Sequence, residues 1–173
     1  MLEQMLATRY GALKAYAVIL CGNPAEADDL VQDAIVSTFG AMRRFDNIGV
    51  AEGYVRRAIA SRFIDSRRRP HRHVRSIDDF AAAAADGAAG PDVVVEHAAD
   101  VAKALRTLPP RERACVALRF LDHLSTRETA DALGISEGAV KRYLADGLAH
   151  LAPLLGTADD LDSHEWIRPE VIS

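Results

Sequence analysis

The residues of this sequence that could do chemistry are arginines, lysines and acids grouped in three segments. The segment nearest the C-terminus, residues 125–148, reads STRETADALGISEGAVKRYLADGL. Ser125 with Glu128 three positions later is a capping box, which predicts the start of a helix. Gly134 suits a left-handed turn, and Ser136 predicts the cap of a second helix. Two short helices joined by a tight glycine turn form a helix-turn-helix, whose second helix fits the major groove of DNA.

The second of these two helices carries the polar groups that could contact DNA. Four of its residues are expected to point outward: Glu137, Gly138, Lys141 and Arg142. Lys and Arg at this spacing can reach phosphates or guanine edges. Any helical hairpin with a glycine turn is the alternative, but Val140 and Leu144 at the spacing that anchors the second helix to the first favour DNA binding.

The segment 54–69 carries six arginines and one acid, Asp65. A charge run is usually a solvated helix face, but these arginines would repel one another without an anionic partner. Tyr54 and Phe63 lie among them, and aromatic rings can stack on unpaired bases. We expect Phe63 to lie in the core instead, because Val55, Ile59 and Phe63 recur at helical spacing. The place of Tyr54 stays open.

The segment 25–33, AEADDLVQD, has four acids and no basic residue before Arg43. Acids in the first turn of a helix are favoured by its dipole, which accounts for Glu26 and Asp28 but not for Asp33. The phosphates of DNA would be repelled by this acidic surface. We therefore expect it to face solvent or a basic protein partner.

Helical periodicity covers most of the chain, and strand patterns are nearly absent. The first helix should bury one face, made of Leu2, Leu6, Tyr10, Leu13, Tyr16 and Leu20. We expect an all-α protein with two small helical domains: a bundle over residues 1–75 and a helix-turn-helix domain over 95–155. The alanine-rich, acidic segment 76–94 is expected to be a flexible linker, and 156–173 an acidic C-terminal tail.

Composition excludes several classes of protein. The net charge of −4 is uneven, since residues 1–75 hold 12 Lys and Arg against 8 Asp and Glu, whereas 76–100 hold six acids and no base. Residues 101–155 are again basic, with 8 Lys and Arg against 6 Asp and Glu. Two basic blocks separated by an acidic segment favour a polyanion partner. Neither a membrane span nor a signal peptide is present, so we expect a soluble cytoplasmic protein. The sequence has no phosphate loop, nucleophile elbow or HExxH, and Cys21 and Cys115 lie far apart. We therefore expect that the protein is not an enzyme and that it has no catalytic residue, metal site or cofactor.

The order of four motifs resembles the extracytoplasmic-function (ECF) sigma factors of bacterial RNA polymerase, group 4 of the sigma-70 family, in their actinobacterial form. These motifs are AEADDLVQDAIVSTF, GYVRRAIASRFIDSRRR, LRTLPPRERACVALRF and the terminal helix-turn-helix. The resemblance covers about residues 5–75 as region 2 and 95–155 as region 4. It implies a factor that binds core RNA polymerase and directs it to promoters through their −10 and −35 elements.

The resemblance also implies which residues make each contact. Core polymerase would bind through its β′ clamp to Asp28, Asp29, Gln32 and Asp33, with its β flap as a second contact. The −10 element would contact Phe45, Asn47, Tyr54, Arg56, Arg57, Ser61, Arg62, Arg67 and Arg68. The −35 element would contact Ser136, Glu137, Gly138, Lys141, Arg142 and Tyr143. Whether an anti-sigma factor also binds stays open.

Three departures from the family pattern bear on these contacts. The family usually has tryptophan at Tyr54 and asparagine at Ser61, and it continues with basic residues where this chain has Ala145, Asp146 and Gly147. Two other functions remain as alternatives. A stand-alone helix-turn-helix regulator would leave the arginine-rich and acidic segments without roles. A protein-binding sigma mimic would use the same surfaces without promoter recognition.

Overall fold

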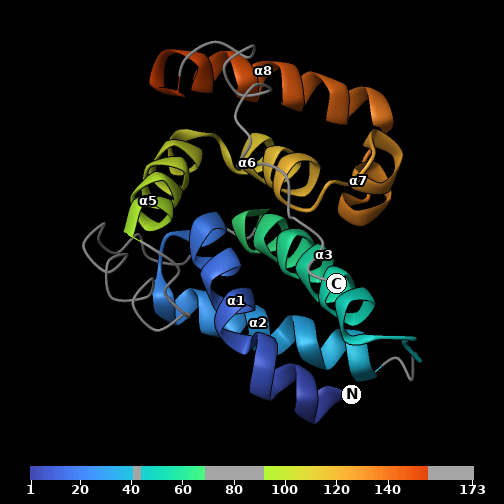
Figure 1. The fold of residues 1–173 in the computed structure, drawn as a ribbon. Coiled ribbons are helices and arrows are strands. Elements are labelled where there is room, and N and C mark those ends of the chain that lie inside the picture. The colour runs from blue at the N-terminus through green and yellow to red at the C-terminus, as the bar shows by residue number, and fades with distance from the viewer. Residues whose placement is uncertain (41–43, 69–91, 156–173) are drawn as a thin grey trace.

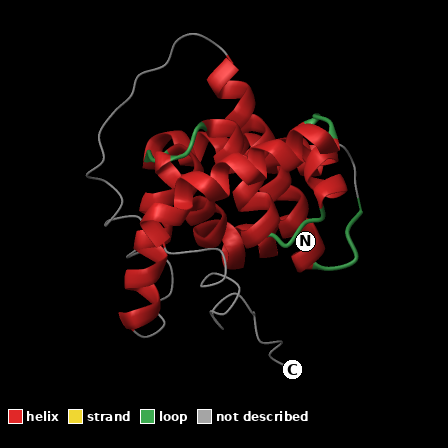
Figure 2. Cartoon of the chain, turned by 90° about the horizontal axis from the view of Figure 1, so that it is seen from above, coloured by secondary structure: helices red, strands yellow, loops and turns green. Residues whose placement is uncertain are grey.

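The structure, a computed structural model, describes residues 1–40, 44–68 and 92–155, with the side chains of 92–98 and 155 left out. Over these ranges the chain is helical and has no strand, which confirms the all-α prediction (Figure 2). The elements are α1 (Leu2–Cys21), α2 (Pro24–Gly40), α3 (Ile48–Arg68), α5 (Asp92–Thr107), α6 (Pro110–Val116), the π-helical turn η2 (Ala117–Leu121), α7 (Thr126–Leu133) and α8 (Glu137–Leu155). Helix α5 begins within the 76–94 range expected for the linker; residues 76–91 and the tail lie outside the described residues.

Helices α1–α3 form the first lobe, residues 1–68. Gly22 ends α1 in the left-handed conformation, at φ 75°, and the Asn23 side chain caps α2 by accepting from the N–H groups of Ala25 and Glu26. The predicted apolar face of α3 is buried, with Phe63 fully so. Local turn chemistry and helical periodicity therefore account for most of this lobe.

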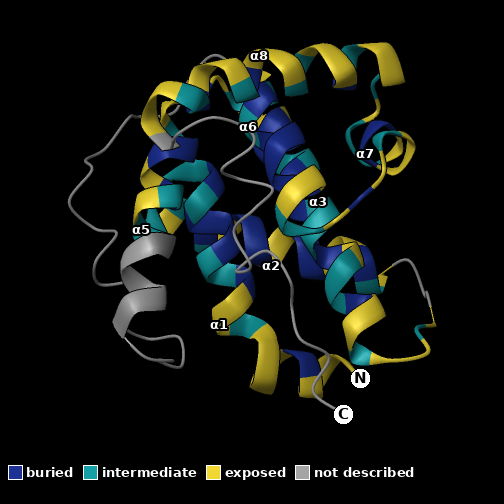
Figure 3. Ribbon diagram, turned by 45° about the horizontal axis from the view of Figure 1, so that its top comes forward, coloured by how far each residue is buried: buried dark blue, intermediate teal, exposed yellow. Residues whose placement is uncertain are grey.

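One part of the predicted face of α1 is wrong. Leu2 and Leu6 are 39% and 43% exposed, whereas Met5 is completely buried and Leu13 and Leu20 are buried as expected. Figure 3 shows that the N-terminal part of α1 is mostly exposed. Adjacent helical residues point about 100° apart. The first turns of α1 thus bury a face one residue away from the stripe that the leucine spacing indicates.

Helices α5–α8 form the second lobe, residues 92–155, and contain the predicted helix-turn-helix. The capping box of Ser125 and Glu128 is formed, and Gly134 closes α7 at φ 63°. The Ser136 hydroxyl accepts from the N–H of Ala139, 3.2 Å away, and caps α8. Helix α8 lies across α6 (Figure 1), and a Cβ on Gly147 would lie only 3.0 Å from the Val116 side chain. A small residue is required at that crossing.

The two lobes share one core. Ala114, Ala117, Leu118 and Leu124 of the second lobe belong to the same buried cluster as Phe63 and the apolar face of α1–α3. Figure 1 shows the second lobe lying over α1 and α3. Sequence periodicity predicts two lobes, but it gives no indication of this contact between them.

The left-handed turn at Gly134 gives a stability prediction. Gly134→Ala should lower the free energy of unfolding by about 1 kcal/mol, because an L side chain is strained at positive φ. No atom lies within 4 Å of the added Cβ, so the loss isolates backbone strain. The control is Gly11→Ala in the middle of α1, equally open, which should raise stability by about 0.5–1 kcal/mol. Urea denaturation measures both, and equal effects would contradict the assignment of the turn.

Candidate functional site

The acidic residues predicted to face a protein partner lie on one exposed face of α2. Asp29, Gln32 and Asp33 are exposed. Asp28 differs from them, because its carboxylate accepts from the Tyr10 hydroxyl at 3.1 Å and lies 3.0 Å from the Lys14 ammonium. The structure thus brings three of the four predicted residues together on the surface and holds the fourth against α1.

An aromatic row precedes the arginines of α3. Phe45 lies between Phe39 and Tyr54, with ring centroids 5.4 and 5.5 Å apart. Tyr54, whose place the sequence left open, is 37% exposed. The side chain of Asn47 accepts from the N–H of Val50 at 2.9 Å and caps the start of α3. That bond gives Asn47 a structural role beside any contact with a ligand.

Arg56 lies at the centre of a charge network between the lobes. Its guanidinium is 2.7 Å from Glu52 and 3.1 Å from Asp122, a residue that follows η2 in the second lobe. The Tyr16 hydroxyl donates to the other Asp122 oxygen at 2.7 Å. Burial opposes the charge of Arg56, but Asp122 and then Glu52 outweigh it and raise the Arg56 pKa. Burial, followed by the charge of Asp122, raises the pKa of Tyr16 well above its usual value.

Neither Glu52 nor Asp122 stood out in the sequence. Glu52 is four residues before Arg56, a helical spacing that favours an ion pair and could have revealed it. Asp122 is 66 positions from Arg56 and 106 from Tyr16. No local pattern marks a contact over such separations.

Arg57 and Ser61 face a cavity where the lobes meet. The Arg57 guanidinium is 3.6 Å from the Glu128 carboxylate of α7 and 5.4 Å from the centre of the Tyr54 ring. The cavity has a volume of about 530 Å³. Its lining comes from α2, α3 and α7: Ser37, Thr38, Tyr54, Arg57, Ala58, Ser61, Glu128, Asp131 and Ala132.

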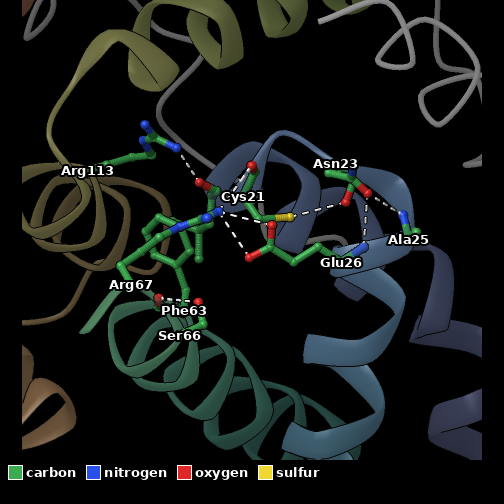
Figure 4. A network of polar contacts seen from close by, with 9 residues as sticks. Cys21, Asn23, Ala25, Glu26, Phe63, Ser66, Arg67 and Arg113 are labelled. Carbon is green, nitrogen blue, oxygen red and sulfur yellow. Dashed lines mark hydrogen bonds and ion pairs between the residues drawn. The ribbon is translucent and has the colours of Figure 1, made fainter. Parts of the chain in front are cut away.

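The other three predicted arginines of α3 lie toward α2 or solvent. Arg67 pairs with Glu26 at 3.0 Å and lies over the Phe63 ring (Figure 4). Arg62 is 3.9 Å from Asp33, and Arg68 is 3.8 Å from Asp65. Exposed pairs of this length contribute little to stability. The structure therefore divides the arginines into a pair facing the second lobe and three at the margin.

Arg113 joins the lobes through the backbone. It donates to the carbonyl oxygens of Leu20, Arg106 and Leu108, and so holds the C-terminal ends of α1 and α5 together. Figure 4 shows the contact with the end of α1. Burial and then the charge of Arg67 lower the pKa of Arg113 to about 10. A helix end leaves carbonyls unpaired, and Arg113 satisfies them.

The predicted outward face of α8 is exposed. Ser136, Glu137, Gly138, Lys141 and Arg142 are all exposed, and Tyr143 is half-buried. The Tyr143 ring lies near two guanidinium groups, 5.0 Å from Arg142 and 5.9 Å from Arg111. Arg111, on α6, precedes the helix-turn-helix, so the pattern of that motif does not indicate its position beside α8. It extends the basic surface beside α8.

Within residues 1–40, 44–68 and 92–155, no group of three or more His, Cys, Asp and Glu side chains could hold a metal ion. No helix of the same ranges is long and apolar enough to cross a membrane.

Comparison with known proteins finds two family models. Residues 5–73 match Sigma-70 region 2, and residues 98–151 match Sigma-70 region 4. The RNA polymerase sigma-E factor of Streptomyces coelicolor is 34% identical over 170 residues, 97% of this chain and 93% of that protein. The ECF RNA polymerase sigma factor SigM of Mycobacterium tuberculosis is 30% identical over 154 residues, 89% of this chain and 76% of that protein.

A solved structure has the same fold. It is the sigma factor RpoE of Bartonella quintana in complex with the anti-sigma factor NepR, with a TM-score of 0.58 at 20% identity. The match covers 90% of this chain and 97% of that chain. Both lobes therefore belong to the shared fold.

The backbone contacts of Arg113 give a second stability prediction. Arg113→Met should lower the free energy of unfolding by about 3 kcal/mol, because three carbonyl groups lose their donor. Arg119→Met is the control; Arg119 is exposed and its loss should change stability by less than about 0.5 kcal/mol. Guanidinium unfolding followed by circular dichroism compares the two. Similar stability of both variants would show that water replaces the guanidinium.

Proposed function

Because this chain belongs to the sigma-70 family as an extracytoplasmic-function sigma factor, we propose a contact for each of its exposed charged surfaces. The protein is a transcription initiation factor that directs core RNA polymerase to promoters. The observation that carries this conclusion is the match of both regions, in order, within one chain that exposes acids on α2 and the pair Lys141 and Arg142 on α8. RNA synthesis belongs to the polymerase, and we assign no reaction to this chain.

The acidic face of α2 is proposed to bind core polymerase. Asp29, Gln32 and Asp33 are exposed together and form a surface suited to a basic helical partner such as the β′ clamp. The Asp28 carboxylate binds Tyr10 and Lys14 of α1 and so holds α2 against α1. Region 4 is proposed to bind the β flap. An anti-sigma partner stays a prediction.

Helix α3 is proposed to hold the −10 strand after melting. Phe45 and Tyr54 form an aromatic row beside Arg57, and bases stack on such rings while arginines bind the phosphates. Ser61 lies at the same surface. Four more arginines of the same helix are proposed as phosphate contacts, although each lies close to a carboxylate in this structure: Arg56, Arg62, Arg67 and Arg68.

Helix α8 is proposed to bind the −35 element in the major groove. Lys141 and Arg142 can reach base edges or phosphates, with Ser136, Glu137 and Gly138 at the helix start. The Arg142 guanidinium lies over the Tyr143 ring, 5.0 Å from its centre.

Run-off transcription with purified core polymerase tests the whole proposal. Adding this protein should give transcripts with defined start sites from genomic fragments that core enzyme alone leaves silent. A helix-turn-helix regulator would bind duplex DNA but start no transcript. A sigma mimic would bind polymerase or an inhibitor without start-site selection.

The acidic face of α2 gives a binding prediction. Asp29→Arg and Asp33→Arg should each weaken association with core polymerase about ten-fold or more, since a like charge then faces the basic partner. Glu3→Arg, an equal charge reversal at an exposed position of α1, should leave the affinity within about two-fold. Fluorescence anisotropy with core enzyme at several salt concentrations measures the effect. Unchanged affinity in both α2 variants would refute this docking surface.

Helix α8 gives a transcription prediction. Lys141→Ala and Arg142→Ala should reduce initiation at promoters with a −35 element by about 1–3 kcal/mol where a base edge is contacted. A phosphate contact would instead weaken all sequences alike and reduce the salt dependence. Lys103→Ala removes an exposed cation of the same lobe and serves as the control. Normal initiation by both α8 variants would remove this helix from the −35 contact.

A further inference from the structure

The guanidinium of Arg142 is held by an aromatic ring and not by a carboxylate. It lies over the Tyr143 ring, 5.0 Å from the ring centre, and within the part of the chain that the structure describes it forms no ion pair. An arginine that is attracted by a ring face needs none of its N–H donors for that contact. All of these donors therefore remain available to a base edge.

The Tyr143 ring is itself fixed by its neighbours. It packs against the buried cluster of Cys115, Ala130 and Val140, where α6, α7 and α8 meet. The Nη1 atom of Arg111 donates to the Tyr143 hydroxyl oxygen at 3.4 Å, and the Arg111 guanidinium is 5.9 Å from the ring centre. These contacts join the ring to α6, the helix on which the helix-turn-helix rests.

Arg111 and Arg142 differ in their access to a ligand. Arg142 is exposed, whereas Arg111 is half-buried. A half-buried guanidinium has fewer directions from which DNA could approach it. The contacts with Tyr143 are therefore the clearest role that the structure gives to Arg111.

This arrangement bears on how Arg142 could recognise a base. An arginine side chain has many rotamers, and ordering it on binding opposes recognition. A bidentate contact with guanine requires the guanidinium in one orientation. A ring that already holds Arg142 reduces the loss of freedom on binding. Lys141 has no ring contact among the described residues, but an ammonium acts as a point charge and needs less orientation.

We infer that Tyr143 and Arg111 are positioning residues for Arg142: Arg111 fixes the ring, and the ring holds the Arg142 guanidinium ready to read one base of the −35 element. This inference rests on the proposed contact of Arg142 with that element. It adds a residue of α6, outside the helix-turn-helix, to those that determine sequence preference.

Transcription from a promoter library measures sequence preference directly. A promoter identified by run-off transcription is given random bases at its −35 element, with a barcode for each variant in the transcribed region. Core polymerase with the full-length chain transcribes the pool, and sequencing of the RNA gives the preference for each base at each position. Each preference is a ratio within one sample, so a smaller fraction of folded protein does not change it.

The variants separate the three roles. Arg142→Ala identifies the position that Arg142 reads. Tyr143→Leu removes the ring but keeps an apolar side chain against the buried cluster, whereas Tyr143→Phe keeps the ring and removes the hydroxyl. Arg111→Met removes the guanidinium from α6. Lys103→Met removes an exposed positive charge from α5 of the same lobe and is the matched control.

Arg142→Ala should lower the preference at one position about ten-fold, as for the loss of a bidentate contact. Tyr143→Leu and Arg111→Met should lower it at the same position about three- to ten-fold, and Tyr143→Phe should lower it less than Tyr143→Leu. Adding Arg111→Met to Arg142→Ala should cause no further loss there, because the residue through which Arg111 acts is gone. Lys103→Met should leave every preference within about two-fold.

Unchanged preferences in Arg111→Met would overturn the inference, and so would additive losses in the double variant. Equal weakening of all sequences by Arg111→Met would instead assign a phosphate contact to Arg111. Relaxation of a different position by Tyr143→Leu would show that the ring contacts a base itself, which also contradicts a positioning role.

The proposed −35 contact is decided separately, by Arg142→Ala alone. If this variant relaxes no position, the contact itself is refuted. If it relaxes one position while Arg111→Met relaxes none, the contact stands and only the positioning role is removed.

Discussion

The arrangement of the molecule depends on burying α6 and η2 from two sides. Ala114, Ala117 and Leu118 belong to the core shared with the first lobe, while Val116 packs toward α5 and α8. The five consecutive residues from Ala114 to Leu118 are all buried, and because consecutive helical residues point in different directions, they need neighbours on more than one side. The helix-turn-helix is consequently not an independent unit: the helix on which it rests also closes the three-helix bundle.

Two arginines at this junction are stabilised in different ways, which gives them different roles. Arg113 is bound by backbone carbonyls, and burial lowers its pKa to about 10. Arg56 has two carboxylates, which raise its pKa. Carbonyl acceptors at helix ends persist as long as the helices do. A phosphate can replace a carboxylate as the partner of a guanidinium. Of these two arginines, Arg56 is therefore the one that can stabilise the fold and also bind an anionic ligand.

The sequence predicted what local chemistry determines. Ser125, Glu128 and Gly134 specify the helix-turn-helix within ten residues, and Val55 with Phe63 marks the buried face of α3. The position of Asp122 could not be predicted, because its partners are separated by loops and depend on how the lobes dock. The burial of Leu2 and Leu6 was predicted wrongly for a related reason. Helical periodicity identifies an apolar stripe, but it does not show whether another helix packs against that stripe.

The mixture of apolar and ionic contacts between the lobes has a physical consequence. An entirely apolar interface would open only at a large cost in exposed surface. Ion pairs such as Arg57 with Glu128 are partly exposed and weaken in salt, and a polyanion supplies the same attraction from outside. The shared apolar cluster around Leu118 does not depend on salt in this way, so apolar packing holds the lobes together where screening weakens the ion pairs.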